Sequence, residues 1–181
     1  MRYYKKIVGE HLFLSPIDLM DSDIYVKWAE WMNNRAVSDQ YGGYHSLVHI
    51  GSAQKTLEGM RGYQFAIVLS ENEELIGFID LHDIDLLFRN AFLGIVIGED
   101  AYRNKGYGTE ATRLILEYGF MTLNLHNVML SVHADNLPAI ACYKKAGFQK
   151  VGCRREAVFK EGKYIDKIFM DILVTDFLKA R

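Results

Sequence analysis

Cysteine, proline and long hydrophobic runs are all scarce in this chain of 181 residues. The two cysteines, Cys142 and Cys153, are too few for a disulfide framework and lack the spacing of metal ligands, so we expect neither disulfides nor a metal site. There are only two prolines, and no apolar run approaches the ~20 residues that a membrane-spanning helix needs. These absences argue against proline-rich disorder and against a membrane protein.

The charges are nearly balanced, and no segment is set apart by its composition. The 21 Lys and Arg residues against 23 Asp and Glu residues give a net charge of −2, which offers no general attraction to nucleic acid. Residues 1–10 lack the apolar core of a signal peptide. Because 50% of the residues are apolar, one sizeable core is expected, and we predict a single cytoplasmic domain over residues 1–181.

Changes in hydrophobic period outline the expected elements. Helices are predicted at about 21–33, more weakly at 46–60, over about sixteen residues after Gly106, and at 138–145. Strands are predicted at 11–16, 64–70, 75–82, 91–97, 128–133, 148–153 and 164–173, with a loop at 38–46 and a hairpin turn at 161–163. This order predicts a mixed α/β sheet with one parallel crossover, and a ligand site beside the helix that begins at Gly106.

A glycine-rich turn, Arg103–Gly108, lies between a predicted buried strand and a long predicted helix. Its backbone N–H groups and the positive end of the helix dipole can face an anion. Gly106 and Gly108 would let the backbone approach phosphate oxygens closely, and Arg103 and Lys105 could add charge-assisted hydrogen bonds. The turn indicates a pyrophosphate site, with an ordinary glycine-containing helix entry as the alternative.

A second group of residues follows the strand at 128–133. Asn136 and Tyr143 are seven residues apart, which is two helical turns, so both would point the same way. Asn136 would lie at the strand end and Tyr143 deeper in a ligand groove. In the alternative interpretation, Asn136 is a helix cap and Tyr143 is a core residue.

Together the two segments resemble the GNAT acyltransferase family. The phosphate loop of that family reads Arg/Gln-x-x-Gly-x-Gly/Ala, and its later segment reads Asn-x-x-Ala-x-x-x-Tyr-x-x-x-Gly-Phe. The matching residues are Arg103, Gly106, Gly108, Asn136, Ala139, Tyr143, Gly147 and Phe148. The resemblance covers residues 75–173, and the stretches 118–126 and 159–166 are similar to the ribosomal-protein and spermidine N-acetyltransferase branch.

The resemblance implies an α/β (α+β) fold with a mixed, mostly antiparallel sheet, a splayed parallel pair and flanking helices. It also implies direct transfer of the acetyl group of acetyl-CoA to a primary amine, such as a polyamine, a protein N-terminus, an amino sugar or another small amine. Leu93–Gly98 would be the family's bulged strand, whose backbone binds the pantetheine arm. The implied acetyl-CoA contacts are Val96, Ile97, Gly98, Arg103, Asn104, Lys105, Gly106, Tyr107, Gly108, Thr109, Asn136 and Lys145.

The resemblance also implies roles in the chemistry. A backbone N–H of Val96, Ile97 or Gly98 would polarise the thioester carbonyl. Tyr143 would lie beside the sulfur and protonate the departing thiolate, since a phenol with a pKa of about 10 is protonated at neutral pH. Asn136 would hold a pantetheine amide.

The general base and the acceptor stay open. An alkylamine with a pKa of about 10.4 must lose a proton before it attacks, and the residues that could take it are Asp80, His82, Glu99 and His133. Acidic side chains in and near the first helix could attract a cationic amine or could simply be solvated. Residues 41–45 could close over the acceptor, or they could be an ordinary surface turn.

Two other interpretations compete with the acetyltransferase hypothesis. Gly106–Ala111 also fits the Gly-x-Gly-x-x-Ala dinucleotide pattern, and Asp135 follows the next strand, although a Rossmann domain needs several parallel β–α–β units. A non-catalytic module could instead keep the acyl-CoA groove as a sensor or an interaction surface. A homodimer is compatible with either function.

Overall fold

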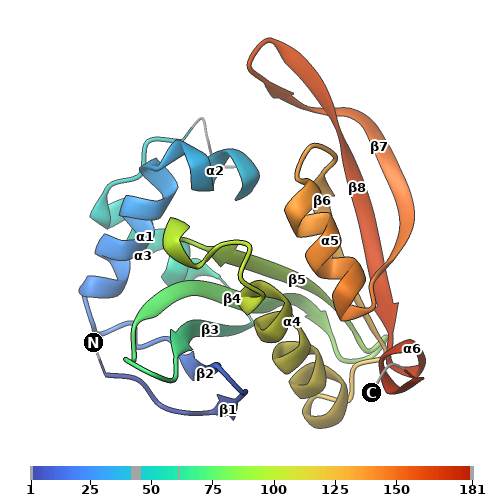
Figure 1. Ribbon diagram of the computed structural model, residues 1–181, viewed down its shortest axis with the longest axis horizontal. Helices are drawn as coiled ribbons and strands as arrows, with labels where there is room; N and C mark the ends of the chain where they lie inside the picture. Colours follow the sequence, from blue (N-terminus) through green and yellow to red (C-terminus); the bar gives the residue numbers. More distant parts are fainter. Residues whose placement is uncertain (1, 42–45, 61, 180–181) are drawn as a thin grey trace.

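The computed structural model describes residues 2–41, 46–60 and 62–179. They form an open eight-stranded sheet with helices on both faces (Figure 1). The strands, in their spatial order, are β1 (Ile7–Val8), β2 (Leu12–Pro16), β3 (Gly62–Leu69), β4 (Leu75–Asp85), β5 (Asn90–Ile97), β6 (Asn127–His133), β8 (Lys163–Leu173) and β7 (Gln149–Lys160).

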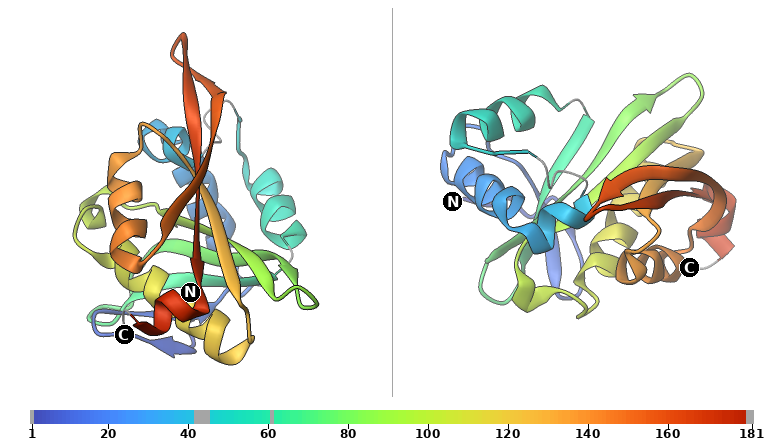
Figure 2. Two further views of the ribbon diagram at one scale, coloured as in Figure 1. Left: turned by 90° about the vertical axis from the view of Figure 1, so that its right-hand side faces the viewer. Right: turned by 90° about the horizontal axis from the view of Figure 1, so that it is seen from above.

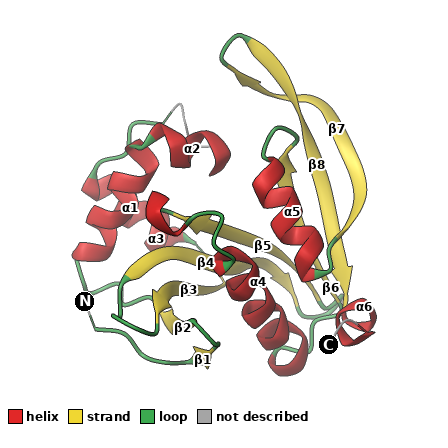
Figure 3. Cartoon of the chain, in the orientation of Figure 1, coloured by secondary structure: helices red, strands yellow, loops and turns green. Residues whose placement is uncertain are grey.

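Helices connect and flank these strands (Figure 3). They are α1 (Asp23–Asn33), α2 (Arg35–Tyr41), α3 (Ile50–Gly59), α4 (Tyr107–Glu117), α5 (Leu137–Ala146) and α6 (Val174–Lys179), with a 3₁₀ turn at Asp100–Tyr102 and a π-helical turn at Tyr118–Thr122. In the described ranges, no helix has the length and apolar character to cross a membrane.

β5 and β6 form a parallel pair, and the other described neighbours pair in antiparallel fashion. The parallel pairing runs only from Asn90 and Asn127 to Phe92 and Met129, after which the strands diverge. This confirms the mostly antiparallel mixed sheet with one splayed parallel pair. It also excludes the dinucleotide interpretation, because the described chain contains a single parallel β–α–β crossover, through α4.

Two cores occupy the two faces of the sheet, because alternate side chains of a strand point to opposite sides. On one face, α1 and α3 bury Trp28 and Leu57 against Phe78 of β4. On the other face, Ile115 of α4 packs in the same core as Ile79 of β4. In Figure 1, α2 lies on one side of the divergence between β5 and β6, and α5 lies on the other.

β7 and β8 form a long hairpin that projects beyond the rest of the sheet (Figure 2). Its tip is a tight turn in which Glu161 (φ 51°) and Gly162 (φ 78°) both have left-handed backbone conformations, which suits the predicted hairpin turn at 161–163. Arg35 of α2 donates to the Glu161 carboxylate at 2.7 Å. The hairpin tip therefore stands over the same end of the molecule as α2.

Several elements differ from the prediction. The predicted loop at 38–46 begins inside α2, and residues 42–45 lie outside the described ranges. The helix after Gly106 is α-helical only to Glu117 and ends in the π turn. β7 continues well past Cys153 because it pairs with β8 again after a register shift between Arg154 and Val158. β1 and α6 are too short to show a hydrophobic period.

The bulge expected within Leu93–Gly98 is not present. β4 and β5 pair in one register from Gly77 and Ile97 to His82 and Phe92, and the register shift falls instead between His82 and Asp85. The divergence of β6, and not a bulge, is therefore what frees the backbone of β5.

Candidate active site

The divergence of β5 and β6 opens a cleft with a volume of about 1080 Å³. The start of α4, the helices α2 and α5 and the β7–β8 hairpin complete its walls. The predicted site residues that line it are Val96, Ile97, Arg103, Asn104, Gly106, Gly108, Thr109, Asn136, Tyr143 and Lys145. Three other predicted residues, Gly98, Lys105 and Tyr107, do not have side chains or backbone in its lining.

The backbone of β5 offers alternate N–H groups to the cleft. Gly98 N–H donates to the Ile76 carbonyl at 2.9 Å and is therefore committed to the sheet. Because antiparallel hydrogen bonds alternate, Val96 N–H also faces β4, whereas the N–H groups of Ile95 and Ile97 face the β6 side. β6 has diverged at that level. Of the three predicted oxyanion donors, Ile97 is therefore the one that faces the cleft.

The glycine-rich turn leaves donors at the start of α4. Gly106 is the N-cap in a left-handed conformation (φ 95°), which a side chain would strain. Thr109 and Glu110 N–H groups donate back to the Gly106 carbonyl at 2.9 and 3.0 Å. The N–H groups of Tyr107 and Gly108 precede them and have no earlier helical carbonyl to bind, so they can face an anion.

α5 forms the floor beneath this turn. A Cβ at Gly108 would lie 3.6 Å from Cys142 Sγ and 3.9 Å from Ile97 Cγ1, which are ordinary contact distances. The Thr109 hydroxyl donates to the Cys142 sulfur at 3.4 Å, and burial raises the pKa of this thiol. Cys142 is thus a packed thiol, and the space above Gly108 has room for a methyl group but not for a large side chain beside a ligand.

The predicted basic residues have different surroundings. Arg103 donates from Nε to the Ile97 carbonyl and from Nη1 to the Ala36 carbonyl, both at 3.0 Å, so its guanidinium ties the end of β5 to α2. Lys105 lies over the Tyr102 ring, outside the cleft, with Nζ 5.8 Å from the ring centroid. Lys145, in the last turn of α5, does line the cleft.

Asn136 both caps a helix and lines the cleft, the two roles that the sequence left open. It is the N-cap of α5, and its Oδ1 accepts the Ala139 N–H at 3.2 Å. It also lines the cleft. With Oδ1 engaged in the cap, the amide NH₂ is the group that can bind a ligand carbonyl.

Tyr143 is a core residue that also borders the cleft. It is 8% exposed, and its ring packs edge-on against Phe148 with centroids 5.9 Å apart. Burial raises the pKa of its phenol well above the usual value, with smaller contributions from Cys142 and Tyr41. The hydroxyl is therefore a proton donor that stays protonated at neutral pH.

The candidate bases fall into three environments. Glu99 accepts from Lys27 Nζ at 2.9 Å and from Trp31 Nε1 at 3.1 Å, which lowers its pKa, and it does not line the cleft. Asp80 and His82 form a hydrogen-bonded pair with Oδ2 and Nδ1 2.5 Å apart. That hydrogen bond is the main reason that the pKa of His82 is raised.

His133 lies at the end of β6 and is 5% exposed. Burial lowers its pKa, and the nearby backbone of Asp39 in α2 partly opposes this shift. Its Nδ1 is buried and has no hydrogen-bond partner in the described chain. His133 therefore lies between β6 and α2 in the lining of the cleft.

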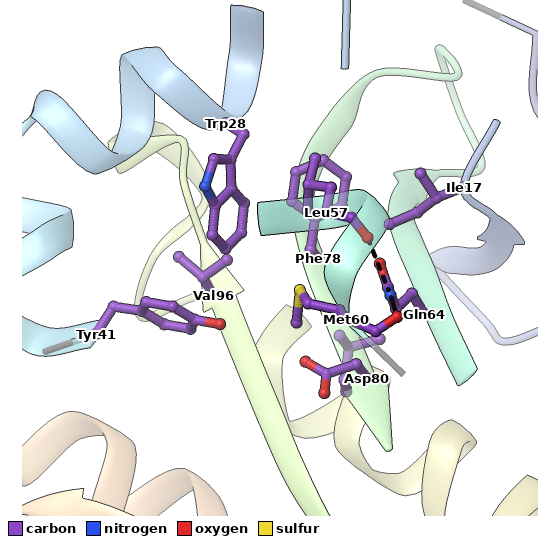
Figure 4. A pocket seen from close by; sticks show the side chains of 10 residues that line it. Ile17, Trp28, Tyr41, Leu57, Met60, Gln64, Phe78, Asp80 and Val96 are labelled. Carbon is purple, nitrogen blue, oxygen red and sulfur yellow. Dashed lines mark hydrogen bonds between the residues drawn. The ribbon is translucent and has the colours of Figure 1, made fainter. Parts of the chain in front are cut away.

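Tyr41 belongs to the segment 41–45, which the sequence left open as either a loop over the acceptor or a surface turn. Figure 4 shows it entering a small cavity from α2, near Trp28, Val96 and Asp80, and it lines the large cleft as well. Burial raises the pKa of its phenol, and the charge of Asp80 raises it further. The sequence did not predict the helix that carries Tyr41, because α2 is short and its period is weak. Other lining residues that were not predicted are Gln40, Phe92, Phe159 and Lys167.

Comparisons with known proteins agree with this geometry. Residues 11–149 match the family model for the acetyltransferase (GNAT) domain. N-acetyltransferase p20 of Bacillus licheniformis, itself uncharacterised, is 28% identical over 174 residues, which cover 93% of this chain and 96% of that protein. Spermidine N(1)-acetyltransferase of Escherichia coli K12 is 35% identical over 105 residues, which cover 58% of this chain and 56% of that protein.

Solved structures share the fold. Spermidine N-acetyltransferase from Vibrio cholerae, in complex with CoA and spermine, superposes with a TM-score of 0.79 at 24% identity, over 94% of this chain and 99% of that one. A GNAT acetyltransferase from Bacillus anthracis gives 0.77 at 21% identity, over 92% and 97%. Acetyl-CoA is the acetyl donor of GNAT acetyltransferases. With the family model matching most of its length, this chain belongs to the GNAT acetyltransferase family.

Proposed function

We propose that this protein transfers the acetyl group of acetyl-CoA directly to a primary amine. The observation that carries the proposal is a single cleft that joins the start of α4 at Gly106, the freed edge of β5 and the buried hydroxyl of Tyr143. Bound acetyl-CoA would supply an activated thioester. The chain's contribution is to hold donor and acceptor in contact and to move protons.

The phosphate end of the cleft suits a pyrophosphate. The N–H group of Gly108, which lines the cleft, lies at the positive end of the α4 dipole, and a Cβ placed at Gly106 would meet open space. Lys145 adds a positive charge from α5. Arg103 contributes less directly, because two of its donors are already bound to backbone carbonyls.

The middle of the cleft suits an extended amide-bearing arm. Ile97 N–H on β5 would donate to one ligand carbonyl, and the Asn136 amide NH₂ on α5 would donate to another. Both residues line the cleft between β5 and β6. We expect Asn136 to affect acetyl-CoA affinity more than turnover.

Tyr143 is the residue that we assign to the leaving group. Its hydroxyl would give a proton to the sulfur as the carbon–sulfur bond breaks, which avoids release of a free thiolate. Burial raises the pKa of the phenol, so the proton donor is present at neutral pH.

The charges around the cleft bear on the choice of amine. Every Asp and Glu of the chain lies within the described ranges, and none of them lines the cleft, whose charged lining residues are Arg103, Lys145 and Lys167. A polyamine carries several positive charges and is stabilised by nearby carboxylates. We therefore favour an amine without a second positive charge, on an aromatic or carboxylate-bearing body that suits Phe92, Phe159 and Lys167.

We also propose that residues 1–181 act as one domain, because both cores are built on the same sheet. Location in the cytoplasm and formation of a homodimer stay predictions.

The proposal is tested by release of CoA thiol from acetyl-CoA. The purified protein is offered phenethylamine, a dipeptide with a free N-terminus, glucosamine and spermidine, each with a no-protein control. We expect release with at least one amine and the weakest release with spermidine. Saturable binding of acetyl-CoA without thiol release from any amine would favour a non-catalytic sensor instead.

A further inference from the structure

Asp80 and His82 form a fixed pair on one face of β4. Asp80 is 6% exposed, and its Oδ2 lies 2.5 Å from His82 Nδ1. A buried carboxylate that binds one imidazole nitrogen fixes both the ring orientation and the tautomer, with the proton on Nδ1. The lone pair of the neutral ring is then on Nε2.

The His82 ring lies where the cleft opens. Its side chain is 36% exposed, lines the cleft, and stacks on Phe92 with centroids 6.0 Å apart. Phe92 is the last residue of β5 that pairs with β6. Within the described residues Nε2 has no hydrogen-bond partner, so it can reach a group that enters the cleft.

The other candidate bases each lack one of these properties. Glu99 is bound to Lys27 and lies outside the cleft. His133 lines the cleft, but it is 5% exposed and its unpartnered Nδ1 is inaccessible. The Asp80 carboxylate is buried and already bound to His82.

The pair and the proposed acid border the same cleft. The Asp80 carboxylate lies close enough to Tyr41 for its charge to raise the pKa of the phenol, and the two residues also line one small cavity. His82, Tyr41 and Tyr143 line the same cleft. A proton acceptor and a proton donor are therefore available in one site, as acyl transfer to an ammonium group requires.

We propose that His82 is the general base of acetyl transfer and that Asp80 is its positioning residue; this rests on the proposed function. His82 Nε2 takes one proton from the acceptor ammonium and later gives it to solvent. The freed nitrogen bonds to the acetyl carbon, the carbon–sulfur bond breaks, and its electron pair goes to sulfur, which takes the Tyr143 proton. Tyr143 regains a proton from the acylated nitrogen, so the net products are the amide, CoA thiol and one proton.

This assignment fixes the sign of the pH dependence. His82 must be neutral to act as a base, so kcat/KM rises with pH through the pKa of His82; this rise is the acidic limb of the pH profile. The hydrogen bond to Asp80 and the charges of Asp80 and Asp83 raise that pKa above its ordinary value. The titratable and charged groups that line the cleft with this ring, from other elements, are Tyr41, Tyr102, Arg103, His133, Cys142, Tyr143, Lys145 and Lys167. Removal of the Asp80 charge should lower the pKa and move this acidic limb to lower pH.

The experiment compares His82→Gln, Asp80→Asn and the surface control His126→Gln. Thiol release with the fastest amine of the panel is followed from about pH 5.5 to 9, acetyl-CoA binding is measured by calorimetry, and the imidazole resonances are titrated by NMR. We expect His82→Gln to lower kcat/KM by about 100-fold or more, to remove the acidic limb and to leave the Kd within about twofold. His126→Gln should change nothing, and Asp80→Asn should shift the limb downward.

Each contrary result has a separate meaning. A His82→Gln protein that keeps the rate or the acidic limb would overturn the base assignment while leaving acetyl transfer intact. An unshifted limb in Asp80→Asn would overturn the positioning role. If His82→Gln does not fold, the NMR titration of the unsubstituted protein decides, because a His82 pKa at or below 6.5 contradicts the pair. No turnover by the unsubstituted protein would refute the proposed function itself.

Discussion

Removal of the Tyr143 hydroxyl tests whether this residue acts as the proposed general acid or only packs in the core. Tyr143→Phe keeps the ring against Phe148 and removes only the proton donor. We expect turnover to fall by about 100-fold, the typical scale for loss of a general acid, while acetyl-CoA affinity stays within about twofold. Thiol release and calorimetry measure the two quantities separately.

The matched control is Tyr118→Phe, at a half-buried tyrosine outside the cleft that packs edge-on against Phe65. It should keep both turnover and affinity. A Tyr143→Phe protein that loses affinity and turnover in equal measure would contradict the assignment and would indicate that the hydroxyl only supports binding.

Substitutions of a second single residue, Gly108, test the proposed phosphate end of the cleft. An alanine there would make ordinary contacts with Cys142 Sγ and Ile97 Cγ1, so Gly108→Ala should fold and bind. Gly108→Trp would fill the groove, and we expect it to weaken acetyl-CoA binding by more than about 100-fold, a loss of ~2.7 kcal/mol. Calorimetry is the measurement, with Gly59→Trp as control because no atom lies within 4 Å of a Cβ at Gly59. Unchanged affinity in Gly108→Trp would remove the phosphate site from this turn.

At the scale of elements, α2 depends on contacts that are distant in the sequence. A seven-residue helix is marginal in isolation, but the Ala36 carbonyl accepts from Arg103, and Arg35 donates to the Glu161 carboxylate. Neither of these partners is within sixty residues, so no local pattern could reveal α2. The same argument explains why Tyr41 was predicted to lie in a loop.

Arg103→Ala tests this dependence. It removes the donors to the half-buried Ile97 carbonyl and the exposed Ala36 carbonyl, and a typical hydrogen bond contributes about 0.5–1.5 kcal/mol to stability. We expect the free energy of unfolding to fall by an amount in that range in urea denaturation. The neighbouring Lys105→Ala, at an exposed side chain outside the cleft, should change it by less than about 0.5 kcal/mol. Equal effects in the two variants would contradict the role of Arg103 as a tie between β5 and α2.

At the scale of the whole molecule, the prediction concerns stability against acid. Burial lowers the pKa of His133 below 6.5, so the unfolded chain binds a proton there before the folded protein does. The stabilisation is complete above about pH 6.5 and is lost as the pH falls toward the folded pKa. His133→Gln should therefore flatten the decline in the free energy of unfolding between about pH 7 and 5.

Urea denaturation at several pH values measures this slope, and His126→Gln, at an exposed histidine, should leave it unchanged. His82 acts in the opposite direction, because its raised pKa contributes stability below pH 6.5 that is lost as the pH rises. The difference between each variant and the unsubstituted protein separates the two histidines. If the free energy of unfolding falls with pH as steeply in His133→Gln as in the unsubstituted protein, the burial argument is contradicted.

Most of the fold, and the location of the cleft beside Gly106 and Tyr143, could be predicted from the sequence. Strand periods and short connections predict the antiparallel meander, and the motifs around Gly106 and Tyr143 have fixed spacings that a local pattern can reveal. The proposed acceptor side could not be predicted from the sequence, because its residues come from α2, β4, β6 and β8. Their grouping depends on the divergence of β5 and β6, which no local period encodes.

The most direct test of the account is a calorimetric titration of the purified protein with acetyl-CoA, followed by a parallel titration with NAD. The cleft between β5 and β6 predicts saturable binding of acetyl-CoA at one site per chain and no binding of NAD. Absence of acetyl-CoA binding would contradict the central claim, and the turn at Gly106 would then be only the start of a helix.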